Sequence, residues 1–214
     1  RPLRDAKVAV LRSIRSPTAD EVAVATSRGR YTAGSVEGRA CAGYVETAGV
    51  DPSRGTETWA ALRLTVDAPR WRGVPFTLRT GKALRRAHRQ IEVHFRAARP
   101  DLSGSGSVLS LQMAPDSVVL DLHAAGPAGL PAVVPLRLSA QRPRQPLPAS
   151  ARLLQDVLAG DPTFAVRDDE TEECWRIVDA VLAGWRTGAP ALQDYAAGSV
   201  GPMMACDHGR PASS

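Results

Sequence analysis

A lysine at a glycine turn is the residue of this sequence best placed to do chemistry. Residues 71–82 read WRGVPFTLRTGK, so a short extended segment leads into Arg-Thr-Gly-Lys and ends at Lys82. A lysine ammonium is a compact cation with three hydrogen-bond donors, which suits the oxygens of sugar hydroxyls or phosphates. The upstream glycine spacing and the following Ser or Thr of a P-loop are missing. The pattern therefore indicates either a cation that projects into a sugar or phosphate cleft or an ordinary solvated turn lysine.

The other basic residues do not point to nucleic acid. The chain has 214 residues, a net charge of +5 and a pI near 9.6, and Lys7 and Lys82 are the two lysines among its 27 basic residues. The arginines are scattered, apart from a cluster at Arg85, Arg86 and Arg89, and aromatic residues make up 5% of the chain. A nucleic-acid surface would combine clustered cations with interleaved aromatic residues. We attribute the excess charge to arginine-biased coding and expect no nucleic-acid partner.

Membrane insertion, disulfides and metal binding are not expected either. No apolar run approaches the roughly 20 residues that a membrane-spanning helix needs. The cysteines, Cys41, Cys174 and Cys206, are odd in number, far apart and without CxxC spacing, which favours a reducing cytoplasm. The four histidines lack the spacing of metal ligands, so no metal-binding residue is predicted.

Hydrophobic periodicity predicts an α+β fold. Helical spacing covers residues 3–14, which Ser16-Pro17 ends, and returns at 153–158 and 168–186, whereas residues 21–25 are expected to be extended. Alternation of apolar and polar residues predicts strands at 62–66, 74–79, 91–95, 109–113, 118–122 and 133–138. Because their connections are too short for crossover helices, we expect a large, mostly antiparallel sheet with helices packed on one side. This domain would cover residues 1–202, and residues 203–214 would form a loose tail.

The lysine motif resembles the signature RWxGVPFxLRTGK of the glucose-6-phosphate dehydrogenase family. Further blocks that resemble this family follow in the family's own order: 4–14 (RDAKVAVLRSI), 43–45 (GYV), 53–62 (SRGTETWAAL), 153–161 (LLQDVLAGD), 169–178 (DETEECWRIV) and 195–202 (YAAGSVGP). Together they span about residues 4–202. The sequence therefore resembles the C-terminal domain of that family over nearly its whole length.

This resemblance implies an oxidoreductase that converts glucose 6-phosphate and NADP to 6-phosphogluconolactone and NADPH in the oxidative pentose phosphate pathway. The family's Rossmann coenzyme domain and its general-base histidine have no counterpart in this chain, so no catalytic residue is assigned. The chain begins with Arg rather than Met and is expected to be part of a longer protein and inactive alone. It would contribute part of the hexose-phosphate pocket, act with a coenzyme-binding domain that holds most of the NADP, and form a homodimer through its sheet.

The resemblance assigns Lys82 to the family lysine that contacts glucose 6-phosphate. Arg79 is also matched, in a region that contacts a second, structural NADP in some members. Ala87 stands where the family usually has a second Lys or Arg, for which Arg86 is the candidate replacement, and Ala114 replaces a glutamine. These departures leave two hypotheses: a substrate domain of an active enzyme, or a degenerate, non-catalytic member that acts as a dimerisation or regulatory partner.

Overall fold

The chain forms two compact units in a computed structural model that describes residues 2–87, 89–96, 106–113, 116–125, 133–141 and 147–202. Unit 1 comprises residues 1–86 and 153–214, and unit 2 comprises residues 87–152. The expected domain over residues 1–202 is therefore divided between the two units. Its expected tail, residues 203–214, lies outside the described residues.

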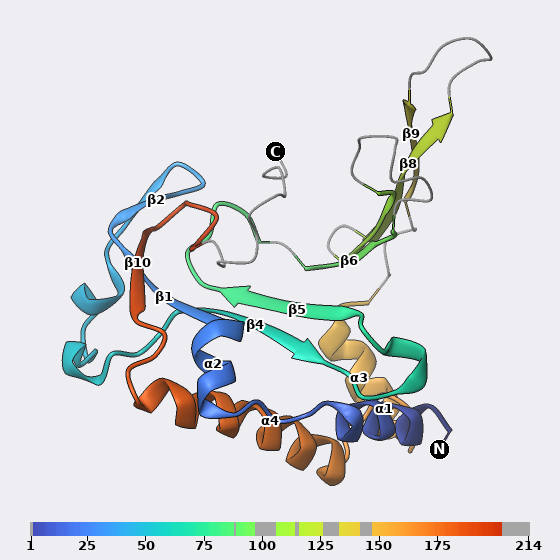
Figure 1. The fold of residues 1–214 in the computed structure, drawn as a ribbon, viewed down its shortest axis with the longest axis horizontal. Coiled ribbons are helices and arrows are strands. Elements are labelled where there is room, and N and C mark those ends of the chain that lie inside the picture. Colours follow the sequence, from blue (N-terminus) through green and yellow to red (C-terminus); the bar gives the residue numbers. More distant parts are fainter. Residues whose placement is uncertain are drawn as a thin grey trace. The chain divides into compact units, whose positions relative to one another are not determined.

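Unit 1 is built on a mixed four-stranded sheet with the strand order β10-β1-β4-β5 (Figure 1). These strands are β1 (Thr26–Thr32), β4 (Trp59–Thr65), β5 (Pro75–Gly81) and β10 (Leu192–Ala196). Strand β4 runs antiparallel to β1 and β5, whereas β10 joins β1 in parallel. A hairpin of β2 (Gly34–Val36) and β3 (Arg39–Cys41) and three 3-10 turns, Tyr44–Glu46, Pro52–Arg54 and Pro69–Trp71, fill the connections.

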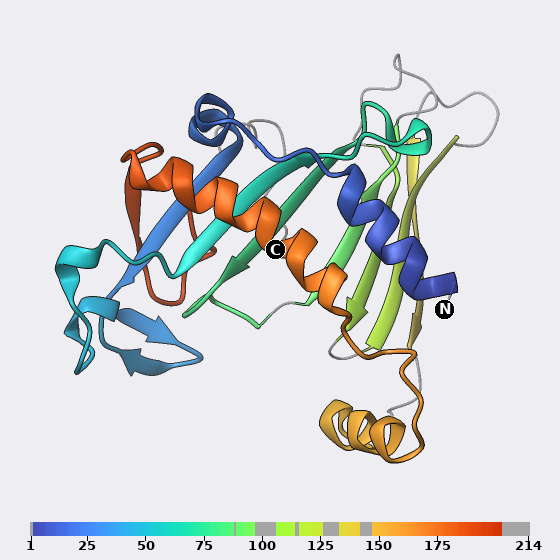
Figure 2. The same ribbon diagram turned by 90° about the horizontal axis from the view of Figure 1, so that it is seen from below.

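Helices α1 (Pro2–Ser13), α2 (Ala19–Ala25) and α4 (Asp168–Arg186) lie on one face of this sheet, and α4 runs across the strands (Figures 1 and 2). Their apolar stripe meets the sheet in a cluster of Val22, Val181 and Trp185, against which Leu62 packs. Because successive strand residues point to opposite faces, Trp59 and Ala61 face the other way. There they form a second cluster with Tyr195, covered by Tyr31 and Leu84.

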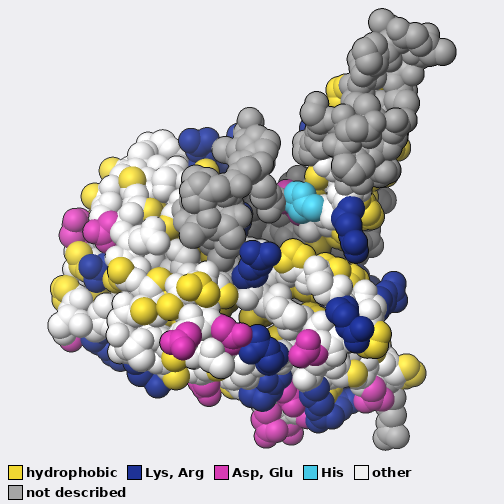
Figure 3. Space-filling model, in the orientation of Figure 1, with side chains coloured by type: hydrophobic (Ala, Val, Ile, Leu, Met, Phe, Trp, Pro, Cys, Tyr) yellow, Lys and Arg dark blue, Asp and Glu magenta, His cyan; other side chains and the backbone are white. Residues whose placement is uncertain are grey.

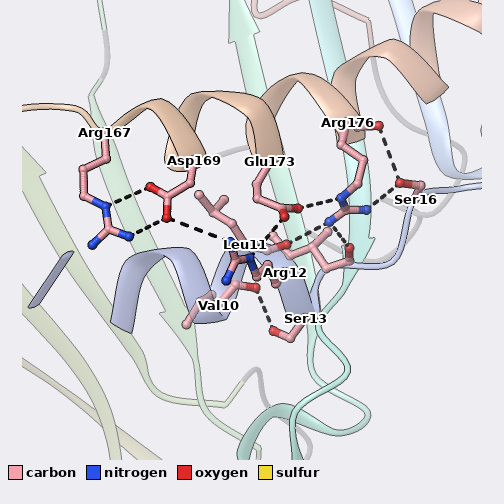
Figure 4. Close-up of polar contacts among 10 residues, drawn as sticks. Val10, Leu11, Arg12, Ser13, Ser16, Arg167, Asp169, Glu173 and Arg176 are labelled. Carbon is pink, nitrogen blue, oxygen red and sulfur yellow. Dashed lines mark hydrogen bonds and ion pairs between the residues drawn. The ribbon is translucent and has the colours of Figure 1, made fainter. Parts of the chain in front are cut away.

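Arg176 of α4 ties α4 to the end of α1 (Figure 4). Its guanidinium donates to the carbonyl oxygens of Leu11 (3.0 Å) and Ile14 (2.8 Å) and to Ser16 Oγ (2.6 Å). The last carbonyl groups of a helix have no partner one α-helical turn further on. The arginine adds a second donor to Leu11 O, which also accepts from Ile14 N–H (3.1 Å), and a donor to Ile14 O just beyond α1. Glu173 orients the same guanidinium from 2.7 Å away. Acidic and basic side chains mingle along the edge formed by α1 and α4 (Figure 3).

Unit 2 contains an antiparallel sheet in the order β6-β7-β8-β9. The strands are β6 (Gln90–His94), β7 (Val108–Met113), β8 (Asp116–Ala125) and β9 (Val133–Gln141). The register places one apolar set on a single face across all four strands. Its members are Ile91, Val93, Leu109, Leu111, Val118, Leu120, Leu122, Val134, Leu136 and Leu138. Helix α3 (Ala149–Leu158) begins in unit 2 and ends in unit 1, and Gly160, two residues beyond its end, has a left-handed φ of +67°.

The α+β class is confirmed, as are the helices near 3–14, 153–158 and 168–186 and the strands predicted by alternation. The strands are divided between two sheets, whereas one large sheet was expected. The extended segment expected at 21–25 is wrong, because Thr18 and Glu21 form a capping box that begins α2. No described helix is long and apolar enough to cross a membrane.

Candidate functional site

Lys82 follows the last residue of β5 and is exposed. A glycine precedes it because a Cβ at Gly81 would approach the indole of Trp59 to 2.5 Å. The chain then turns through Ala83, whose φ of +49° is in the left-handed region that favours glycine. Gly81 therefore packs directly against Trp59, whereas the side chain of the next residue, Lys82, is exposed.

The backbone of Lys82 is held on both sides of its Cα atom. Its N–H donates to the carbonyl oxygen of Thr58 (2.9 Å), and its carbonyl oxygen accepts from the Tyr195 hydroxyl (2.8 Å). Tyr195 is 6% exposed, and burial raises the pKa of its hydroxyl above the ordinary value of 10.0, so it is a protonated donor at neutral pH.

The segment after β10 holds the rest of the turn. Gly198 N–H donates to the carbonyl oxygen of Ala83 (2.7 Å), and Arg85 N–H donates to that of Ser199 (2.8 Å). The φ of Gly198 is +87°, and a Cβ there would fall on the carbonyl oxygen of Ser35. Two of the motifs identified in the sequence, LRTGK and YAAGSVGP, are thus neighbours in unit 1.

The other predicted cations differ in their positions. Arg79 pairs with Ala61 across β4 and β5, which places it on the sheet face opposite the helices. Arg86 is exposed and is the last residue of the first segment of unit 1, whereas Ala87 and Arg89 belong to unit 2. Ala114 lies outside the described residues. The roles in substrate binding that the resemblance implies for Lys82, Arg79 and Arg86 stay predictions.

Two hollows in the described part of the chain lie away from Lys82. One of about 430 Å³ lies between α1 and α4 and is lined by Leu3, Val10 and Cys174 among others, and one of about 230 Å³ lies near Arg72 and Gly73. Lys82 lines neither of them. A substrate at Lys82 would need further walls.

The described residues do not form a Rossmann-type site for a dinucleotide coenzyme. Dinucleotides bind where a parallel strand leads through a glycine-rich turn into a helix. The parallel pair found among the described strands is β1 and β10, and β1 leads into the β2–β3 hairpin rather than into a helix. No group of three or more metal-ligating side chains gathers within the described ranges, where Cys41 and Cys174 are free thiols.

The role of Tyr195 was missed, although the residue belongs to a quoted block. Its contact with Lys82 depends on the pairing of Tyr31 with Tyr195 across β1 and β10, which lie far apart in the chain. The segment LQDYA, residues 192–196, gives no clear signal of its own, because the exposed Gln193 and Asp194 are adjacent and break the alternation of a half-buried strand.

Known proteins are similar in sequence to this chain over nearly its whole length. The model of the family described as glucose-6-phosphate dehydrogenase, C-terminal domain, matches residues 1–210. The glucose-6-phosphate 1-dehydrogenase of Treponema pallidum is 38% identical in an alignment of 219 positions that covers 96% of this chain and 42% of that protein. The enzyme of the same name from Gluconobacter oxydans is 39% identical over 95% of this chain and 43% of its own length.

Solved structures of the same class of enzyme also have a similar fold. A glucose-6-phosphate dehydrogenase in complex with its substrate glucose-6-phosphate superposes with a TM-score of 0.77 at 25% identity, over 99% of this chain and 45% of that one. Glucose-6-phosphate 1-dehydrogenase from Mycobacterium avium gives 0.76 at 29% identity, over 99% and 44%. The chain thus spans less than half the length of the relatives it matches. With its fold and its motif blocks, this places the chain in the glucose-6-phosphate dehydrogenase C-terminal domain family.

Proposed function

We propose that this chain supplies the substrate-binding sheet of a glucose-6-phosphate dehydrogenase and acts only together with a coenzyme-binding domain. The assembled enzyme oxidises glucose 6-phosphate to 6-phosphogluconolactone with reduction of NADP in the cytoplasm. Lys82 contributes a cation to the hexose-phosphate pocket, with Arg79 and Arg86 as further candidates. The observation that carries the proposal is the exposed Lys82, held by its backbone in a matched motif.

The chemistry divides between the two domains in a simple way. The ammonium of Lys82 can donate to phosphate or hydroxyl oxygens and so orient the sugar. NADP, held by the coenzyme-binding domain, accepts the hydride. No described residue is assigned as the base, and the side chain of Lys82 is exposed to water. We therefore expect the purified chain alone to form no NADPH from glucose 6-phosphate and NADP, and sustained NADPH formation by it would refute this division.

We infer a homodimer through the apolar face of the unit 2 sheet. Ile91, Leu136 and Leu138 on that face remain 49%, 47% and 50% exposed. A large exposed apolar patch marks an interaction surface in most proteins. Leu138→Glu is expected to shift the protein to monomer in analytical ultracentrifugation. Ser139→Glu, one residue along the strand and on the opposite face, is the matched control.

A non-catalytic role is the second candidate function, and Ala87 favours it. An alanine at this position removes a cation that the family usually directs to the substrate. A charge-assisted hydrogen bond contributes about 1.5–3 kcal/mol, so its loss would weaken hexose-phosphate binding about 10- to 100-fold. If Ala87→Arg restores no activity to the chain joined to a coenzyme-binding domain while the dimer still forms, the dimerisation or regulatory role is favoured.

A further inference from the structure

A relay of hydrogen bonds runs over the unit 1 sheet and ends at the backbone of Lys82. The N–H of Tyr31 lies 3.0 Å from Thr58 Oγ1, and Thr58 Oγ1 lies 3.0 Å from the hydroxyl oxygen of Tyr195. That hydroxyl lies 2.8 Å from the carbonyl oxygen of Lys82. The three tyrosine and threonine groups come from β1, from the residue before β4 and from β10.

The donors and acceptors of this relay can be assigned in one consistent direction. Thr58 Oγ1 accepts from the Tyr31 amide, so its own proton is available for the hydroxyl oxygen of Tyr195. Tyr195 then has one proton to give. The carbonyl oxygen of Lys82, at 2.8 Å, is a nearer acceptor than the carbonyl oxygen of Thr58, at 3.3 Å. Hydrogen bonds in such a chain polarise one another and strengthen the last bond.

The relay matters because it acts on the residue that carries the predicted cation. A lysine in a free turn must lose backbone freedom as well as side-chain freedom when it binds a ligand. Here both the N–H and the carbonyl of Lys82 are already bonded. Only its side-chain rotamers remain to be ordered, so part of the entropic cost of binding is met in advance.

We propose that Tyr195 is a positioning residue for Lys82: its hydroxyl fixes the lysine backbone so that the ammonium is presented to the phosphate or hydroxyl groups of a hexose phosphate. This inference rests on the proposed function for its ligand. The fixing of the backbone does not depend on the ligand and is measured separately.

Tyr195→Phe removes the donor and leaves the ring, and Tyr31→Phe is the matched control. Tyr31 packs edge-on against Tyr195 at 6.3 Å between ring centroids, and none of the described contacts uses its hydroxyl. In the 214-residue chain, hydrogen exchange of the Lys82 amide, which donates to Thr58, is expected to become about tenfold faster in Tyr195→Phe, as loss of one hydrogen bond predicts. The same amide should change less than about twofold in Tyr31→Phe.

The two lysines of the chain allow ligand binding to be observed at one residue. After reductive methylation with a ¹³C label, the NMR signal of the Lys82 methyl groups follows a titration with glucose 6-phosphate. The corresponding signal of Lys7, which pairs with Glu170, shows any global change. The expected dissociation constant at Lys82 is several-fold weaker in Tyr195→Phe, by up to about tenfold. Placing p-aminophenylalanine at position 195 restores an N–H donor and is expected to restore both the exchange rate and the affinity.

Each result has a definite reading. Wild-type exchange and affinity in Tyr195→Phe, or no rescue by p-aminophenylalanine, would overturn the positioning role. A wild-type Lys82 signal that does not move with glucose 6-phosphate, both in the 214-residue chain and in the chain joined to a coenzyme-binding domain, overturns the proposed function instead, and the exchange data still decide the role of Tyr195. If Tyr195→Phe does not fold, exchange of the Tyr195 hydroxyl proton in the wild-type protein decides instead. A slowly exchanging Tyr195 hydroxyl proton close to Lys82 supports the proposal, and a freely exchanging one contradicts it.

Discussion

Gly184 of α4 faces Val22 of α2 so closely that a Cβ atom on Gly184 would lie 2.6 Å from Val22 Cγ1. Val22 is fully buried in the cluster that joins α2, α4 and β4. The short distance explains a glycine in the last turns of a long helix, where alanine would otherwise be favoured by about 1 kcal/mol. The close approach of α2 and α4 fixes the helical layer that supports the unit 1 sheet.

Gly184→Ala is expected to destabilise the chain despite that gain in helix propensity. Forcing a methyl group into a packed core costs about 1–3 kcal/mol, so we expect a net loss of roughly 1 kcal/mol in the free energy of unfolding by urea. In the double variant with Val22→Ala the new methyl group has room, and the two losses should be less than additive. A single Gly184→Ala variant more stable than wild type would contradict the packing.

Thr26→Val tests a buried polar link between β1 and α4. Thr26 Oγ1 accepts from the indole N–H of Trp185 (2.8 Å) and donates to the carbonyl oxygen of Val22 (2.7 Å). Thr26 and Trp185 are buried, and an unsatisfied buried donor costs about 1–3 kcal/mol. We expect Thr26→Val to lose that much stability in urea and Thr26→Ser, which keeps the hydroxyl, to lose less. Equal losses would show that the hydroxyl contributes nothing.

The pH dependence of stability should report the pair of Arg15 and Glu21 at the start of α2. Hydrogen bonds from the Arg15 guanidinium, and next from the Thr18 amide, lower the pKa of Glu21 from 4.5 to about 2. A carboxyl group with a pKa depressed in the folded state stabilises the fold above its unfolded pKa. That contribution is lost as the pH falls from about 4.5 towards 2.

Urea unfolding at pH 6 and pH 3 measures this contribution by difference. Glu21→Gln keeps the shape of the capping box but cannot ionise, so it should lose less stability between the two pH values than the wild type does. Glu37→Gln, at an exposed turn residue, is the control for loss of one carboxylate. Identical slopes for wild type and Glu21→Gln would show that the pair does not form in solution.

Much of the fold could be predicted because its elements are amphipathic. One apolar face runs along each of helices α1 and α4 and strands β4 to β9. The spacing of apolar residues that forms this face is visible in the sequence. Strand β1 could not be found this way, since TSRGRYT packs through Thr, Ser and Gly. Helix α2 was misread because Val22 and Val24 alternate as in a strand, whereas its start is decided by the Thr18 capping box.

The candidate site was predictable only in part for a similar reason. Lys82 belongs to a local motif and could be singled out from its neighbours. Its backbone is held by Thr58, which the pairing of β4 with β5 places beside it, and by Tyr195, which the pairing of β10 with β1 brings from the other end of the chain. Long-range register of this kind leaves no local pattern in a single sequence.

The most direct test joins this chain to the coenzyme-binding part of a relative, such as that of the Gluconobacter oxydans enzyme, and follows NADPH formation from glucose 6-phosphate. The fusion protein is expected to be active and the chain alone inactive. Lys82→Met should lower kcat/KM for glucose 6-phosphate about 10- to 100-fold, because a charge-assisted hydrogen bond is lost. Arg186→Met, which removes an exposed cation from the end of α4, should change it little. An inactive, folded fusion protein, or one whose activity is indifferent to Lys82→Met, would contradict the account.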